Sequence, residues 1–175
     1  MKNKVLTDSF ALMLVKLLTM AVSIVSTMVL SRQLDLVHYG TYSTGNLLIN
    51  TATSLSALGL LDAVNYYYNG QSKENRKKYI DTVFALVILM GAFAGTIILV
   101  FGSYIQNYFH NPLLTSILIY VAFRPLLANL GLGMQNLQVS IGKAKVVAIR
   151  NSIISFSKLA VVIITAYITH NIKTI

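Results

Sequence analysis

Three basic residues, Arg124, Lys158 and Lys16, stand inside apolar stretches of the sequence that are long enough to cross a bilayer. An arginine in hydrocarbon costs about 2.5–3.5 kcal/mol on insertion scales, so each of these charges needs a cavity, a partner or a headgroup. The acids nearest to these stretches, Asp62 and Asp81, fall at an expected boundary and not at mid-depth. An excess of positive charge predicts an anionic ligand, and a phosphate suits both guanidinium and ammonium groups.

The expected depth of these cations in the bilayer separates two interpretations, a side chain that faces a cavity and a side chain that reaches the lipid headgroups. Arg124 and Lys158 each lie about 11–12 residues from an end of their stretches, which is near mid-bilayer at about 1.5 Å per residue. Lys16 is only about two turns from an end, so its ammonium group can also reach the headgroups by snorkelling. Pro125 follows Arg124, and the kink expected there would make room for the arginine side chain.

Polar residues recur at helical spacing in the stretches that hold these cations and in one more. We expect Asn46, Asn50, Gln135 and Ser155 to line a cavity, because a polar stripe that faced lipid would be costly. The stripes comprise Ser9, Lys16, Thr19, Ser23, Ser26 and Thr27; Ser43, Asn46, Asn50, Thr53 and Ser54; Tyr120, Arg124, Gly131, Gln135 and Gln138; and Asn151, Ser155, Lys158, Thr165 and Thr169.

The composition determines which elements carry these stripes. Hydrophobic residues make up 55% of the 175 residues, charged residues make up 11%, and the mean hydropathy is +0.68. Soluble domains usually have about 25% charged residues, so the chain is predicted to be an all-α polytopic membrane protein. We expect one transmembrane domain over residues 1–175, with spans near 9–31, 39–61, 80–103, 112–138 and 147–169.

Basic residues in the short connections predict that the N-terminus is cytoplasmic. With this orientation, the inner segments hold nine of the 14 basic residues and the outer segments hold only Arg32 and Lys173, as the preference of Lys and Arg for the inner side requires. The start "MKNK" resembles the basic part of a signal peptide, but the apolar run after it reaches spanning length, so we expect a retained first helix. The basic loop "KENRKK" is expected to meet anionic lipid, and no nucleic acid is needed to explain the net charge of +9. The inner basic residues are Lys2, Lys4, Lys73, Arg76, Lys77, Lys78, Lys143, Lys145 and Arg150.

The third span lacks a polar stripe and carries "GAFAG" instead. Gly91 and Gly95 are four residues apart, with Gly102 on nearly the same face. Small residues at this spacing let helix backbones approach closely, so we expect a packing edge and not a binding site.

No catalytic pattern is present in the sequence. The chain has no cysteine, and His38, His110 and His170 fall at separate outer boundaries without ligand spacing. No glycine-rich phosphate loop follows a strand. We therefore expect no enzyme, no cofactor and no metal site.

The stretch Ser31 to Asn69 resembles the polysaccharide transporter branch of the multidrug/oligosaccharidyl-lipid/polysaccharide flippase superfamily. The elements that carry the resemblance are "SRQL", "HYGTYS" and "LGLLDAVNYYYN". The resemblance implies 12 to 14 helices in two bundles around a central cavity, in the bacterial plasma membrane. It also implies translocation of a polyprenyl-pyrophosphate-linked oligosaccharide by alternating access, with basic cavity residues on the pyrophosphate. Of those residues, only Arg124, Lys158 and, less directly, Lys16 match in position and charge.

The resemblance also raises the expectation of a fragment. Such a transporter needs about six helices in its first bundle, whereas five are predicted here, so the partners would include a missing C-terminal half or other polysaccharide assembly proteins. Two alternatives stay open: a drug or cation exporter of the same superfamily, and a non-transporting membrane adaptor. An exporter of cations calls for intramembrane acids, and an adaptor has no reason to gather Arg and Lys at mid-membrane.

Overall fold

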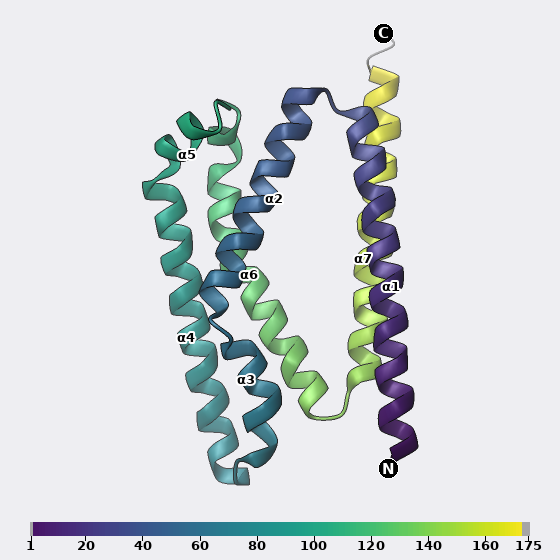
Figure 1. Cartoon of the computed structure of the whole chain (residues 1–175), viewed down its shortest axis with the longest axis vertical. Coiled ribbons are helices and arrows are strands. Elements are labelled where there is room, and N and C mark those ends of the chain that lie inside the picture. The colour runs from purple at the N-terminus through teal and green to yellow at the C-terminus, as the bar shows by residue number, and fades with distance from the viewer. Residues whose placement is uncertain (1, 173–175) are drawn as a thin grey trace. The chain divides into compact units, whose positions relative to one another are not determined.

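The computed structural model describes residues 2–172, with side-chain surroundings for residues 10 and 12–165 apart from 65 and 73. This part of the chain is helical and contains no strand, so the all-α prediction is confirmed (Figure 1). In order the elements are α1 (Lys2–Gln33), α2 (Leu36–Ala57), α3 (Leu60–Tyr67), the 3-10 turn η1 (Tyr68–Gly70), α4 (Lys73–Val100), α5 (Gly102–Tyr108), α6 (Leu114–Ser140) and α7 (Ala144–Ile172).

Four of these helices contain a stretch that is long and apolar enough to span a membrane, namely Leu12–Gln33, Glu74–Val100, Leu114–Ser140 and Ala144–Thr165. The predicted second span, 39–61, is not one continuous helix. It is broken after α2, and α2 and α3 make an angle of 48° across the break. Counting that bent pair as one span gives five, the predicted number.

Backbone geometry explains the break. Leu58 and Gly59 have φ values of 45° and 72°, in the left-handed region that ends a right-handed helix. Gly59 adopts this conformation without a steric penalty, whereas Leu58 does so at a cost of about 1–2 kcal/mol. The apolar run continues through both residues, and for this reason the hydropathy pattern alone predicted an unbroken span.

Two boundaries differ from the prediction for local reasons. The basic segment expected to be a loop is instead the first turn of α4, which begins at Lys73 after Ser72 in extended conformation. The predicted start of the fourth span at Pro112 is two residues too early. Asn111 Oδ1 accepts a hydrogen bond from the Leu113 N–H at 3.1 Å, and the helix proper begins at Leu114.

The chain divides into two compact units, and each is described by itself. The first unit comprises residues 1–39 and 142–175 and contains α1 and α7, which lie side by side (Figure 1). Half-buried positions on α1 alternate three and four residues apart, the spacing of a coiled-coil seam. They are Leu12, Val15, Thr19, Val22, Ser26, Val29 and Gln33, and Leu30 beside Val29 is also half-buried.

The second unit, residues 40–141, contains most of α2 and all of α3, α4, α5 and α6. In it α4 and α3 both pack against α6. One apolar cluster joins α3 to α4 through Leu61, Val64, Val83 and Val87. A second cluster joins α4 to α6, and α2 packs on it; its buried members are Ile98, Leu118, Val121 and Ala122.

The glycine edge of α4 is confirmed as a packing surface. A Cβ atom on Gly91 would lie 2.9 Å from the Cα atom of Leu126, and one on Gly95 would overlap the carbonyl oxygen of Ala122. Both neighbours belong to the α6 backbone and cannot move aside cheaply. Glycine at these two positions therefore sets how closely α4 and α6 approach.

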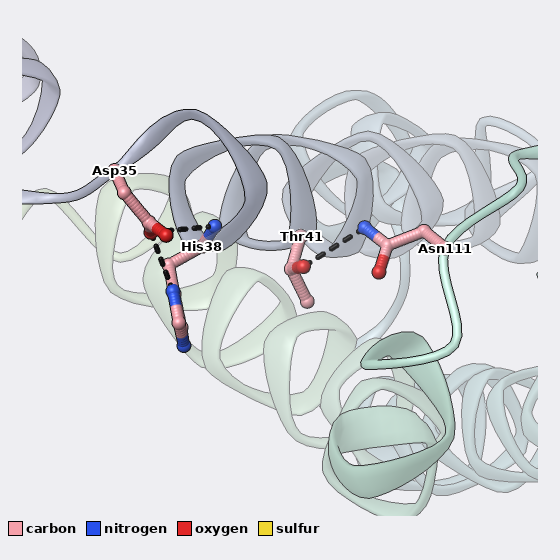
Figure 2. Close-up of polar contacts among 4 residues, drawn as sticks. All are labelled: Asp35, His38, Thr41 and Asn111. Carbon is pink, nitrogen blue, oxygen red and sulfur yellow. Dashed lines mark hydrogen bonds and ion pairs between the residues drawn. The ribbon is translucent and has the colours of Figure 1, made fainter.

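Polar contacts fix the start of α2. Asp35 Oδ1 accepts a hydrogen bond from the His38 N–H at 3.1 Å, as an N-cap residue does, and it also pairs with the His38 ring (Figure 2). Farther along α2, the buried Thr41 hydroxyl accepts a hydrogen bond from Asn111 Nδ2 at 2.8 Å (Figure 2). This second bond ties α2 to the connection that precedes α6.

Candidate functional site

Arg124 is half-buried on α6, within the second unit. Its Nε atom is buried and has no hydrogen-bond partner among the residues that the structure describes. Its guanidinium carbon lies 5.9 Å from the centre of the Tyr120 ring, one turn earlier on the same helix. This cation–π contact steadies the side chain but uses none of the N–H donors, so they are available to an acceptor.

Arg124 lies on the side of α6 that faces away from the packing with α4. At about 100° per residue, Arg124 and Gly131 are on nearly the opposite side of the helix from Ala122 and Gly133. Ala122 and Gly133 are buried, whereas a Cβ atom on Gly131 would meet nothing within 4 Å. Of the predicted stripe of the fourth span, Gly131 therefore lies in open space, whereas Arg124, Gln135 and Gln138 are half-buried.

A second polar stripe, which is not among the stripes predicted from the sequence, runs down the packed side of α6. Asn129 Nδ2 donates to Ser56 Oγ of α2 at 2.7 Å, and Asn136 Nδ2 donates to the carbonyl oxygen of Leu61 in α3 at 2.7 Å. Below them, Asn69 Nδ2 donates to the Ser140 carbonyl oxygen at 3.2 Å. The signal was present in the spacing: residues 129, 136 and 140 share one helical face. These amides hold the broken α2–α3 segment against α6.

The other predicted cavity residues of this unit occupy different environments. Asn46 and Gln135 are half-buried, and Asn50 is exposed. Gln138, on the Arg124 side of α6, has a buried Oε1 atom without a hydrogen-bond partner in the described part of the chain. The unsatisfied atoms of Arg124 and Gln138 make this side of α6 the strongest candidate for a ligand-binding surface.

Lys16, Ser155 and Lys158 belong to the first unit. Both lysines are exposed, and Ser155 is half-buried along the α1–α7 pair. The prediction that these residues share one cavity with Arg124 stays a prediction, because the two units are described separately.

The hydroxyl groups in the α1 stripe bond within their own helix. Thr19 donates to the Lys16 carbonyl oxygen at 2.9 Å, and Ser26 donates to that of Val22 at 2.8 Å. These groups therefore need no cavity to be satisfied. The side chains of Ser9 and Thr169, which the predicted stripes also include, lie outside the described residues, as does Lys173.

The family model for polysaccharide biosynthesis protein matches residues 29–175, which is most of the chain. The chain belongs to this family. No curated protein and no solved structure matches it.

The family match and the membrane helices together place this chain in polysaccharide biosynthesis as a membrane-embedded protein. The matched region contains all of the second unit, with Arg124, and also contains Lys158. Lys16 precedes the matched region, which leaves it with weaker support as a site residue. Within the described residues, no three His, Cys, Asp or Glu side chains gather in a way that could hold a metal ion.

The basic turn at the start of α4 is ordered by two contacts. Arg76 Nε donates to the Gln71 carbonyl oxygen at 3.2 Å, and the guanidinium carbon lies 5.1 Å from the centre of the Tyr68 ring. Lys77 and Lys78 are exposed beside it. The turn therefore presents a cluster of positive charge at one end of α4, where the sequence predicts the inner membrane surface.

Proposed function

We propose that this polysaccharide biosynthesis protein serves in flipping a polyprenyl-pyrophosphate-linked oligosaccharide from the inner to the outer leaflet of a bacterial plasma membrane. The observation that carries the proposal is Arg124, a cation near the middle of a membrane span with a buried Nε that no described residue satisfies. A pyrophosphate supplies the acceptor oxygens and the negative charge that this group lacks.

The transport cycle is proposed to be alternating access without chemistry on the substrate. Arg124, together with Lys158 and, less directly, Lys16, would hold the pyrophosphate while the sugar crosses in a polar cavity. Asn46, Asn50, Gln135 and Ser155 would offer hydrogen bonds to the sugar hydroxyls. The cavity would lower the free energy of crossing, because its polar groups replace the water around the charged and polar groups of the substrate, which is too costly to transfer into hydrocarbon.

The charge balance of the spans favours this cargo over a cationic drug. Glu74 and Asp81 lie within the first three turns of α4, Asp62 lies in the first turn of α3, and no acid lies near the middle of the four continuous spans. A site for cations would need such an acid. We further propose that the basic turn of α4 rests on anionic phospholipids, whose attraction is about 1 kcal/mol per basic residue near the surface.

Substitution of Arg124 tests the proposed function. In cells whose glycan export depends on this chain, Arg124→Ala is expected to abolish most export at matched protein level, and Arg124→Lys to retain part of it. Lysine keeps the charge but loses the planar fork that binds two oxygens at once. Arg124→Glu is expected to be at least as harmful as alanine, because a carboxylate repels phosphate.

A matched control separates this effect from a general loss of charge. Arg32→Ala removes a guanidinium from the exposed end of α1 and is expected to leave export close to wild type. Membrane insertion of Arg124→Ala should be normal, since removing a charge lowers the cost of insertion, and export by the lysine and glutamate variants is compared at matched protein level. Export by the Arg124→Glu variant at the wild-type level would contradict the proposal.

A further inference from the structure

Two oxygen atoms, one near the end of α2 and one on α6, are buried without a hydrogen-bond donor in the described part of the chain. Asn129 of α6 is fully buried, with 0% of its surface exposed. Its Nδ2 atom donates to Ser56 Oγ, but its Oδ1 atom accepts no hydrogen bond from any described residue. The Oγ1 atom of Thr53 is likewise buried and without a partner in the described part of the chain. A buried polar atom left unpaired costs about 1–3 kcal/mol, so a pair of them calls for an explanation.

Ser56 links the two residues that carry these oxygens. Thr53 and Ser56 are three residues apart and so lie on the same side of α2. Ser56 Oγ donates to the Thr53 carbonyl oxygen at 3.2 Å and accepts from Asn129 at 2.7 Å. The amide of Asn129 is therefore docked on the last two turns of α2, the turns to which Thr53 also belongs.

The helix break gives this place a negative potential. α2 ends at Ala57, one residue after Ser56, so the carbonyl groups of its last turn lack partners within the helix. They carry the negative end of the helix macrodipole, equivalent to about half an elementary charge. Broken membrane helices expose such carbonyl groups at sites that coordinate a monovalent cation.

We propose that Thr53 Oγ1, Asn129 Oδ1 and the carbonyl end of α2 bind a small alkali-metal cation such as Na⁺. Every group in this set is a neutral oxygen, the donor type that hard cations take. The absence of a carboxylate from these groups favours a single charge over a divalent ion, which would be left uncompensated. The nearest basic residue along α6, Arg124, is five positions from Asn129 and about 140° around the helix, so it does not enter the set.

A buried water molecule is the competing occupant. Water also satisfies buried oxygen atoms that lack donors, and it needs two to four polar partners. The two occupants differ in one measurable respect, because only a cation makes the stability of the protein depend on which salt is present. Ligands that bind the folded state raise its stability in proportion to the logarithm of their concentration.

The test uses the purified 175-residue chain in detergent, unfolded by heat in sodium, potassium or choline chloride at equal ionic strength. The expected result is a Tm about 2–4 °C higher in sodium or potassium than in choline, the size of shift that modest ligand binding gives in a chain of this length. Choline serves as the reference because it is a cation too large for the site.

Thr53→Val is the decisive variant. Valine has the shape of threonine without the hydroxyl group, and Thr53 Oγ1 makes no hydrogen bond to a described residue, so the Tm in choline should be equal to or above that of wild type. The rise in alkali salt should disappear. Thr96→Val is the matched control, because this exposed hydroxyl of α4 bonds only to the Ala92 carbonyl oxygen. It should keep the full response.

Two results would overturn the proposal. One is an equal Tm of the wild-type chain in all three salts, which would assign the site to water. The other is a salt response that Thr53→Val retains in full, which would place the cation elsewhere. Neither result depends on transport, so this inference stands or falls separately from the flippase proposal.

Discussion

At the scale of single residues, the polar side chains of α6 have different roles on its two sides. Asn129 and Asn136 point into the packing with α2 and α3, where each hydrogen bond at 2.7 Å satisfies an oxygen of a neighbouring helix. Arg124 points to the other side, and no described residue satisfies its Nε. The same helix therefore separates groups that stabilise the fold from groups that are available to a ligand.

The Asn136 hydrogen bond should contribute measurably to stability. Asn136→Ala removes the donor to the Leu61 carbonyl oxygen, and we expect the free energy of unfolding to fall by about 0.5–1.5 kcal/mol. Denaturant unfolding of the detergent-solubilised chain measures this change. Asn107→Ala, at an exposed asparagine of α5, is the control and should be within about 0.5 kcal/mol of wild type. An equal loss in both variants would refute a structural role for Asn136.

At the scale of secondary-structure elements, the close approach of α4 and α6 depends on two glycines of α4. Without a hydrophobic drive between helices in lipid, this contact gains its stability from tight van der Waals packing. The α2–α3 break depends on a different feature, two consecutive residues with positive φ. The α4 glycines and the bent α2–α3 segment both pack against α6, and this packing sets the direction in which Arg124 faces.

Gly95→Ala should disrupt the α4–α6 contact, although it adds only one methyl group. The added Cβ would overlap the Ala122 carbonyl oxygen, so the backbones must separate, and we expect a loss of about 1–3 kcal/mol in unfolding free energy.

Gly131→Ala is the matched control for Gly95→Ala. It adds the same methyl group to α6 where nothing lies within 4 Å, and it should be neutral or stabilising by up to about 1 kcal/mol through helix propensity. If Gly95→Ala behaved like Gly131→Ala, the tight packing of α4 on α6 would be wrong.

At the scale of the whole molecule, the proposed orientation follows from the placement of basic residues. Asn75 and Asn107 are exposed and lie beyond opposite ends of the apolar part of α4. α4 has 28 residues and is therefore about 42 Å long, enough to span the bilayer. We therefore expect the two asparagines to lie on opposite sides of the membrane.

Single cysteines at these positions test the orientation directly, since the chain contains no native cysteine to remove. In intact cells, Asn107→Cys should react with a membrane-impermeant thiol reagent, and Asn75→Cys should react only after the membrane is opened. The reverse labelling would place the N-terminus outside and invalidate the count of inner basic residues.

The sequence by itself determined the fold class, the four continuous spans and the small-residue edge of α4. Each of these follows from a one-dimensional pattern: the length of an apolar run, the low content of charge, and the spacing of Gly91 and Gly95. It also singled out Arg124, because a charge inside an apolar run is visible without a structure. The roles of Lys158 and Lys16 remain predictions from that same pattern.

The tertiary structure decided what the patterns left undetermined. The break at Leu58 and Gly59 depends on two dihedral angles inside a run that is apolar throughout, so the hydropathy pattern does not reveal where the helix breaks. The assignment of Asn129 and Asn136 to the fold, and the proposal that the Arg124 side of α6 meets a ligand, required knowing which face of α6 meets its neighbours. A helical period shows that residues share a face, but only the packing of other helices decides whether that face is covered.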